Sequence, residues 1–151
     1  MIAALYTALT AIAAVFALDK GVIQFRISEA LVILPLFMPE AVIGLTVGCL
    51  ISNLLLSGAI YDIIFGTLAT LIGAIGTRLM KKLPKKLLFL ATLPPILSNS
   101  IIIPFVLRYA YQAEGTYWFF FLTVGIGEIL TAGILASILG YAIANNKKLT
   151  L

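Results

Sequence analysis

The sequence predicts an all-α membrane protein in which residues 1–151 form a single domain, a six-transmembrane-helix bundle. Apolar residues make up 62% of the chain and charged residues only 11%, whereas soluble domains carry about a quarter charged residues. Uncharged runs such as residues 87–107 have the length that crosses a hydrocarbon core of roughly 30 Å. These runs are continuous rather than alternating, which favours helices over a β-barrel.

Six segments are expected to cross the membrane, and the charges of one loop orient them. The expected helices cover residues 1–18, 28–38, 39–56, 59–79, 87–107 and 117–144. Arg78 and four lysines (Lys81, Lys82, Lys85 and Lys86) surround the loop after the fourth helix. Because short loops rich in Lys and Arg stay in the cytoplasm, this loop and both termini are predicted to be cytoplasmic. Topology accounts for these cations, so the expected partner is the bilayer and not a nucleic acid.

Residue types for metal, redox and hydrolytic chemistry are nearly absent. The chain has no histidine and one cysteine, Cys49, which lies in an apolar run. No metal site, disulfide or cofactor is therefore predicted. No phosphate-binding loop is visible, and we do not expect an enzyme. Any specific binding by the chain must therefore come from the few polar side chains within its helices.

The densest polar cluster lies where the first loop meets the short second helix. Gln24, Arg26, Ser28 and Glu29 fall within about one turn of its expected start. One explanation is structural: Ser28 caps the helix, Glu29 suits its dipole, and Arg26 pairs with Glu29. Capping does not account for Gln24 and Arg26, so we interpret the cluster as a candidate binding site for a small polar molecule.

Asn53, Tyr61 and Asp62 are expected on the same side of the membrane as this cluster. Asn53 lies about one turn from the end of the third helix, and Tyr61 and Asp62 begin the fourth. Asn53 either bonds a neighbouring helix or contacts a ligand. Asp62 is either a helix-start charge or a member of the site.

The fifth helix contains Pro94 and Pro95, which are expected to break it. Proline removes backbone hydrogen bonds, and broken membrane helices are tolerated where they line a cavity. Asn99 beside the break is a candidate to face a ligand, unless nearby hydroxyls only repair the kink. Further along, Tyr117 and Trp118 either belong to an interfacial aromatic belt or stack on a flat ligand.

Glu128 is the strongest functional candidate. It lies about eleven residues into the last helix, on the order of 16 Å deep at 1.5 Å per residue. A carboxylate at that depth is costly and is expected to face the protein interior with a partner. The structural alternative is a buried bond to Asn99 or Ser98.

Small residues mark two helix surfaces. Ala4 and Ala8 lie on one face of the first helix, where small side chains allow another helix to approach closely. That face either packs within the chain or binds a partner. Gly44 and Gly48 form a GxxxG motif, which indicates helix packing.

Five motifs in this order resemble the queuosine-precursor transporter family (QueT), the substrate-binding S-components of energy-coupling factor (ECF) transporters. The likeness extends over nearly the whole chain. The motifs are residues 23–31 (IQFRISEAL), 37–40 (FMPE), 48–53 (GCLISN), 62–70 (DIIFGTLAT) and the pair Gly127 and Glu128.

The resemblance implies an S-component-like bundle in the cell (plasma) membrane of a bacterium, with a substrate pocket facing outside. It also implies a transmembrane T-component and two cytoplasmic ATPase subunits as partners. Ala4 and Ala8 match the small-residue face that such proteins offer to the T-component. ATP hydrolysis is then expected in the partner subunits.

The implied substrate is a 7-deazaguanine such as preQ1, preQ0 or queuine. Its guanine-type edge offers two parallel N–H donors, which suit one carboxylate, and we assign that edge to Glu128. Other roles are expected for groups of residues. Hydrogen bonds to the O6 side of the ligand are assigned to Asn99, Asn53, Gln24 or Arg26. Stacking on the ring is assigned to Trp118 or Tyr117. The positive charge of an aminomethyl group is assigned to Asp62 or Glu29 as its counter-charge.

Alternative functions remain open at this point. The chain is either an S-component for another vitamin, of the thiamine or riboflavin class, or a small membrane structural or channel subunit. A membrane enzyme acting on lipid headgroups would need a nucleophile with its base or metal ligands on the inner side, where few carboxylates lie.

Overall fold

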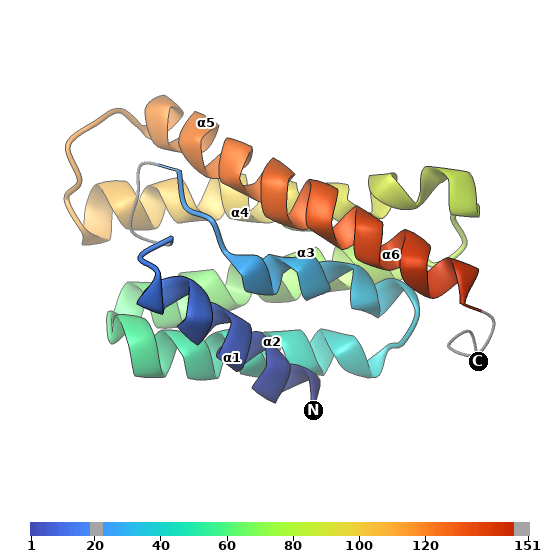
Figure 1. Cartoon of the computed structure of the whole chain (residues 1–151). Coiled ribbons are helices and arrows are strands. Elements are labelled where there is room, and N and C mark those ends of the chain that lie inside the picture. Colours follow the sequence, from blue (N-terminus) through green and yellow to red (C-terminus); the bar gives the residue numbers. More distant parts are fainter. Residues whose placement is uncertain (19–22, 147–151) are drawn as a thin grey trace.

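The computed structural model describes residues 1–18 and 23–146, and every regular element in them is a helix (Figure 1). The principal helices are α1 (Ile2–Val15), the 3₁₀ helix η1 (Ile27–Leu36), α2 (Glu40–Ser52), α3 (Thr67–Leu79), α4 (Leu93–Phe105), α5 (Tyr117–Glu128) and α6 (Ala136–Asn145). Shorter segments extend them, namely the 3₁₀ helix η4 (Lys85–Thr92) and the π-helical η2 (Asn53–Ser57), η3 (Asp62–Gly66), η5 (Val106–Ala110) and η6 (Ile129–Leu135).

Within residues 1–18 and 23–146, four continuous helices are long and apolar enough to cross a membrane. They are Glu40–Ser57, Asp62–Leu79, Lys85–Ala110 and Tyr117–Asn145. Two further apolar helices, Ile2–Val15 and Ile27–Leu36, are shorter. The predicted all-helical membrane bundle is thus confirmed, whereas six complete crossings and the side on which the termini lie stay predictions.

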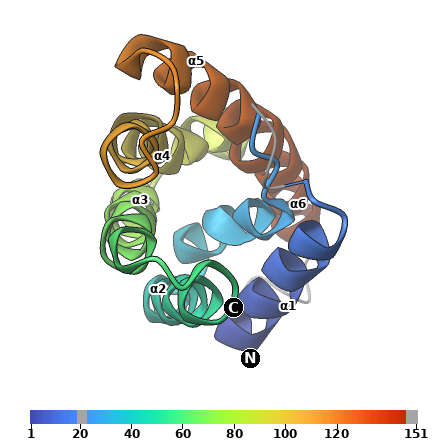
Figure 2. The ribbon, with the colours of Figure 1, turned by 90° about the vertical axis from the view of Figure 1, so that its left-hand side faces the viewer.

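The short helix η1 occupies the middle of the bundle, where the other helices surround it (Figure 2). Val32 and Ile33 pack against alanines of the later helices, and Leu31 packs against α1 and α2. At its C-terminal end, the Arg78 guanidinium donates hydrogen bonds to the Pro35 and Leu36 carbonyls at 3.2 and 3.4 Å. The opposite end of η1 begins at Ile27 and places the polar residues before it inside the bundle.

Helices α1 and α2 pack closely through the GxxxG motif. A Cβ atom at Gly44 would lie 2.8 Å from the Ile2 Cβ, and one at Gly48 would lie 2.9 Å from the Ala3 carbonyl oxygen. The motif therefore serves packing within the chain, as predicted. Ala4 and Ala8 lie on another face of α1 and are exposed.

The expected break at Pro94 and Pro95 is not found. The 3₁₀ helix η4 continues directly into α4 at Leu93, and the two prolines lie in the first turn of α4. Pro95 has no N–H for the carbonyl four residues earlier, and the Thr77 hydroxyl of α3 donates to that Ala91 oxygen at 2.8 Å. A side chain from the neighbouring helix thus replaces the missing backbone bond and keeps the helix continuous.

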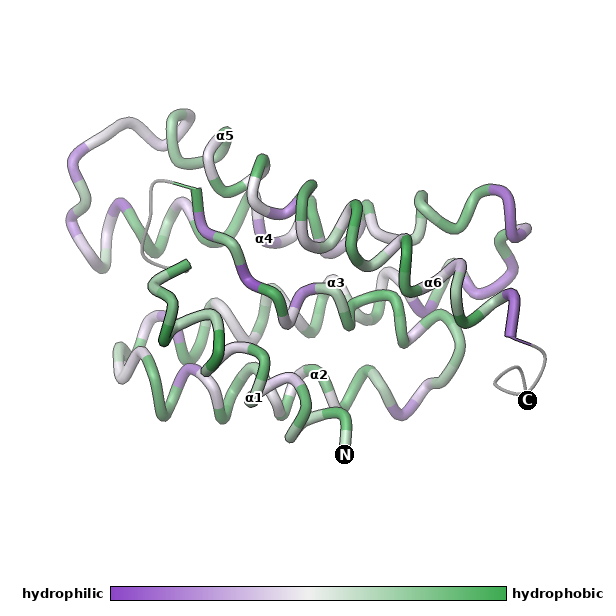
Figure 3. The backbone as a smooth tube through the Cα atoms, in the orientation of Figure 1, coloured by the Kyte–Doolittle hydropathy of each residue, from purple (hydrophilic) through white to green (hydrophobic). Residues whose placement is uncertain are grey.

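The two ends of the bundle are polar and the band between them is largely apolar (Figure 3). At one end the loop around Lys85 meets the end of α6, where the Lys85 ammonium donates to the Ala144 carbonyl at 2.8 Å. The connections after α2 and after η5 lie at the other end (Figure 1).

Candidate functional site

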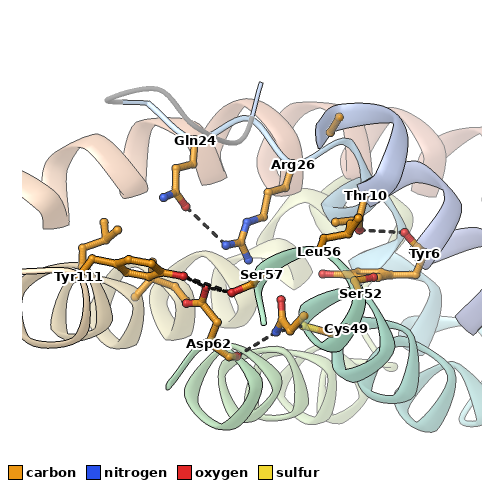
Figure 4. A pocket seen from close by; sticks show the side chains of 14 residues that line it. Tyr6, Thr10, Gln24, Arg26, Cys49, Ser52, Leu56, Ser57, Asp62 and Tyr111 are labelled. Atoms are coloured by element: carbon orange, nitrogen blue, oxygen red, sulfur yellow. Dashed lines mark hydrogen bonds between the residues drawn. The ribbon is translucent and has the colours of Figure 1, made fainter. Parts of the chain in front are cut away.

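A pocket of about 410 Å³ lies at the end of the bundle opposite the basic loop (Figure 4). Its volume falls in the range of about 300–1,000 Å³ that is usual for small-molecule sites. The lining residues come from α1, the first loop and the helices from α2 to η5. They are Tyr6, Thr10, Ala13, Gln24, Arg26, Cys49, Ser52, Asn53, Leu56, Ser57, Asp62, Ile103, Leu107 and Tyr111.

Helix α1 contributes one face to the pocket wall. Tyr6, Thr10 and Ala13 follow the spacing that places residues on the same side of a helix. The Tyr6 hydroxyl donates to the Glu29 Oε1 at 2.6 Å, and the Thr10 hydroxyl donates to the Ser28 hydroxyl at 2.9 Å. The wall is thereby tied to the first turn of η1.

Asp62 organises the opposite rim of the pocket. Its Oδ2 accepts hydrogen bonds from the Tyr111 hydroxyl and, at 2.5 Å, from the Ser57 hydroxyl. The Asn53 amide donates to the Asp62 backbone carbonyl at 2.9 Å. Partial burial, together with the hydrogen bond to Asp62, raises the pKa of the Tyr111 hydroxyl, so it remains a donor at neutral pH. This rim joins three helices by hydrogen bonds.

The π-helical segments η2, η3 and η5 all border the pocket. Asn53 begins η2, Asp62 begins η3, and Leu107 lies in η5. Segments of this kind are rare, and they occur frequently at functional sites. Their presence in three neighbouring helices supports a binding role for this end of the bundle.

Arg26 carries the positive charge of the pocket wall. Among the described residues its guanidinium donates one hydrogen bond, to the Gln24 side chain at 3.5 Å, and forms no ion pair. It nevertheless attracts both Glu29 and Glu128 electrostatically. Most of its five N–H donors are therefore available to another molecule.

Glu128 lies behind the segment of residues 24–26 and does not line the pocket. It is buried, with 6% of its surface exposed, and Asn99 of α4 interacts with its side chain. The preceding residue must be glycine, because a Cβ at Gly127 would lie 2.2 Å from the Gln24 carbonyl oxygen. Gly127 thus allows the first loop to rest directly on α5 beside Glu128.

In the part of the chain that the structure describes, two buried carboxylate oxygens lack a hydrogen-bond partner, Glu29 Oε2 and Glu128 Oε2. An unsatisfied buried polar atom costs about 1–3 kcal/mol, and more when it is charged. The interior thus offers free acceptors close to the free donors of Arg26. Within residues 1–18 and 23–146, no group of three or more His, Cys, Asp or Glu could hold a metal ion.

The structure brings four of the predicted residues together in one pocket: Gln24, Arg26, Asn53 and Asp62. Asn53 also bonds across to the next helix, which is the structural interpretation of this residue. The structural explanation of the first cluster holds only in part: η1 begins at Ile27 without a side-chain cap, so Ser28 does not cap it, whereas Glu29 does lie in its first turn. Ligand contact by these residues stays a prediction.

The predicted aromatic residues lie outside the pocket lining. Tyr61 is exposed, stacks on Phe65 and borders an apolar groove between α3 and α4. Trp118 is 69% exposed, and the Tyr117 hydroxyl donates to the Ile101 carbonyl at 2.8 Å. These positions are those expected of an interfacial aromatic belt, and they do not place the rings against a ligand in this pocket.

Sequence reasoning missed Tyr6, Thr10, Ser57 and Tyr111 as lining residues. The spacing of Tyr6 and Thr10 contains a signal, because both lie on the face of α1 away from Ala4. Nothing local to Ser57 or Tyr111 indicates that the two hydroxyls meet at Asp62.

Comparisons with known proteins agree with one another. A family model described as QueT transporter matches residues 1–145. A curated protein of Lactococcus lactis subsp. cremoris (strain MG1363), named queuosine precursor transporter QueT, is 43% identical over 72 residues. That match spans 48% of this chain and only 42% of the relative's own length. No solved structure matches the chain.

Proposed function

Because the chain belongs to the QueT transporter family, we propose that it binds a queuosine precursor, a 7-deazaguanine such as preQ1, preQ0 or queuine, for transport across the membrane. The relative from Lactococcus lactis is named for the same class of substrate. The pocket of about 410 Å³ has the size of a small-molecule site.

The cluster of unpaired hydrogen-bonding groups carries this proposal. A guanine-type edge supplies N1–H and an exocyclic amine, two donors that suit one carboxylate. Glu128 Oε2 is an unpaired acceptor, and the O6 side of the ligand suits the free donors of Arg26 or Gln24. The Asn53 amide would first have to release its bonds to the Asp62 carbonyl and the Cys49 sulfur. Contact with Glu128 requires residues 24–26 to shift away from their position over Gly127.

The carrier is proposed to be the S-component of an ECF-type ABC importer, with a T-component and two cytoplasmic ATPases as partners. The exposed Ala4 and Ala8 face of α1 supports this assignment, since small residues permit close helix approach in lipid. ATP hydrolysis then belongs to the partners. Ala4→Phe with Ala8→Phe should abolish copurification with these subunits while ligand binding persists. Leu122→Phe, on the exposed face of α5, is the control.

The proposed orientation places the pocket outside a bacterial cell membrane, with six crossings and both termini inside. Its support is the arrangement of the bundle, because the basic loop around Lys85 and the residues that line the pocket lie at opposite ends (Figure 1). Loops rich in Lys and Arg remain cytoplasmic, so the pocket then faces outward.

The test of ligand recognition is Glu128→Gln, which preserves shape but removes the charge. Hydrogen bonds to charged groups contribute about 1.5–3 kcal/mol, so the affinity for 7-deazaguanines should fall at least tenfold. Calorimetry on the purified chain measures this, with Glu40→Gln, an exposed carboxylate at the start of α2, as the matched control. Unchanged affinity in Glu128→Gln would refute the role of Glu128. Absence of binding by the wild-type chain would refute the function.

A further inference from the structure

Two tyrosines that line the same pocket, Tyr6 and Tyr111 (Figure 4), each donate a hydrogen bond to a carboxylate, and the environments of the two pairs differ. Tyr111 bonds Asp62 at the exposed rim, where Asp62 Oδ2 also accepts from Ser57. Tyr6 bonds Glu29 in the interior, where Tyr6 and Glu29 are each 1% exposed. The rim pair is satisfied within the chain and partly in water, whereas the interior pair is not.

The interior pair is short of hydrogen-bond donors. The Tyr6 hydroxyl donates to Glu29 Oε1 at 2.6 Å, while Glu29 Oε2 has no partner. A hydroxyl that donates to a carboxylate becomes a stronger acceptor, because hydrogen bonds in a chain polarise one another. Beside its interaction with the Cys49 side chain, the Tyr6 hydroxyl oxygen keeps a lone pair for a further donor, and Tyr6 lines the pocket.

The interior is also short of positive charge. Arg26 attracts two buried carboxylates, Glu29 and Glu128, and these two repel each other. In the described part of the chain, Arg26 is the only cationic residue on the pocket wall, and it forms no ion pair there. One guanidinium can balance only one ionised carboxylate, and burial disfavours a charge on the other unless a further cation is present. A ligand that brings a positive charge would relieve this imbalance.

We propose that Tyr6 determines specificity by accepting a hydrogen bond from a protonated amine of the ligand, with Glu29 behind it as the counter-charge. This inference rests on the proposed function and narrows its substrate class. Among 7-deazaguanines, the site selects the form with an aminomethyl cation over the uncharged nitrile and unsubstituted forms. Of the two carboxylates considered for this charge, Glu29 has the free oxygen, whereas Asp62 Oδ2 is occupied by Tyr111 and Ser57.

The test compares three ligands on the purified full chain by calorimetry: 7-aminomethyl-, 7-cyano- and unsubstituted 7-deazaguanine. The wild type should bind the amine at least about tenfold more tightly than the two neutral ligands, since the interaction involves a charged donor. Tyr6→Phe removes only the hydroxyl, and it should reduce this preference to less than about threefold. Tyr141→Phe is the matched control and should retain the preference, because the Tyr141 hydroxyl bonds the Lys86 carbonyl at the other end of the bundle.

Each outcome separates this inference from the proposed function. Equal affinity of the wild type for the amine and the nitrile overturns the charge preference but leaves 7-deazaguanine binding intact. Retention of the full preference by Tyr6→Phe overturns the role of Tyr6. If Tyr6→Phe does not fold, the same comparison of three ligands is made on Glu29→Gln. This variant keeps an acceptor for the Tyr6 hydroxyl and removes the counter-charge, so it should lose the preference for the amine. Failure of all three ligands to bind the wild type refutes the proposed function itself.

Discussion

Gly127→Ala is the substitution whose effect follows most directly from the structure. The added Cβ would lie 2.2 Å from the Gln24 carbonyl oxygen, whereas carbon and oxygen ordinarily approach to about 3.3 Å. Either residues 24–26 or α5 must therefore retreat by roughly 1 Å. Overpacking of this kind costs about 1–3 kcal/mol. Because the displaced segment carries Gln24 and Arg26 into the pocket, we expect lower stability together with weaker ligand binding.

Thermal unfolding in detergent and calorimetry with a 7-deazaguanine measure the two effects of Gly127→Ala. The matched control is Gly133→Ala in the same continuous helix, where the new Cβ would meet no atom closer than 3.5 Å. The control should unfold and bind like the wild type, while Gly127→Ala should lose about tenfold in affinity, as 1.4 kcal/mol corresponds to a factor of ten. Indistinguishable behaviour of the two alanine variants would refute the close approach of the loop to α5.

Three further substitutions test individual contacts. Thr77→Val should destabilise the fold by about 1–3 kcal/mol in denaturant unfolding, because the buried Ala91 carbonyl loses its donor. Thr77→Ser keeps the hydroxyl and should not lose this hydrogen-bond contribution. Equal stability of the two variants would contradict the repair of the helix by Thr77. Arg78→Met should cost about 1 kcal/mol by removing the donor to the end of η1, while the exposed control Lys81→Met should have no effect. Trp118→Phe should change ligand affinity less than about twofold by calorimetry, since Trp118 is 69% exposed and surface substitutions change little; a tenfold loss would place it in the site.

Hydrophobicity was sufficient to locate the helices, because lipid admits only helices and closed barrels and the continuous apolar runs lack the alternation of a barrel. The expected segment at residues 39–56 corresponds to Glu40–Ser57, and the last one corresponds to Tyr117–Asn145. The break at Pro95 was expected for a local reason, the missing N–H. Its repair depends on Thr77, a residue distant in sequence, and no local pattern reveals that pairing.

The candidate site was partly predictable for a related reason. Charged and amide side chains are rare in this chain and costly in a membrane, which made Arg26, Asp62 and Glu128 conspicuous. Tyrosine is common at membrane boundaries, so Tyr6 did not stand out, although it lines the pocket and bonds Glu29. The π-helical turns depend on tertiary packing, and local propensity did not indicate them.

Residues 24–26 divide the polar interior, and this division allows three properties to be tested separately. The pocket wall presents Tyr6 and Arg26, while Glu128 lies deeper, beyond the contact between Gln24 and Gly127. If the site is organised in this way, Tyr6→Phe changes the ratio of affinities between charged and neutral ligands. Glu128→Gln should instead weaken all 7-deazaguanines by a similar factor, because they share the edge it is proposed to recognise. Gly127→Ala should weaken all of them and lower the unfolding temperature as well. An identical pattern for the three variants would mean that the loop, the wall and the deep carboxylate do not act as separate parts of one site.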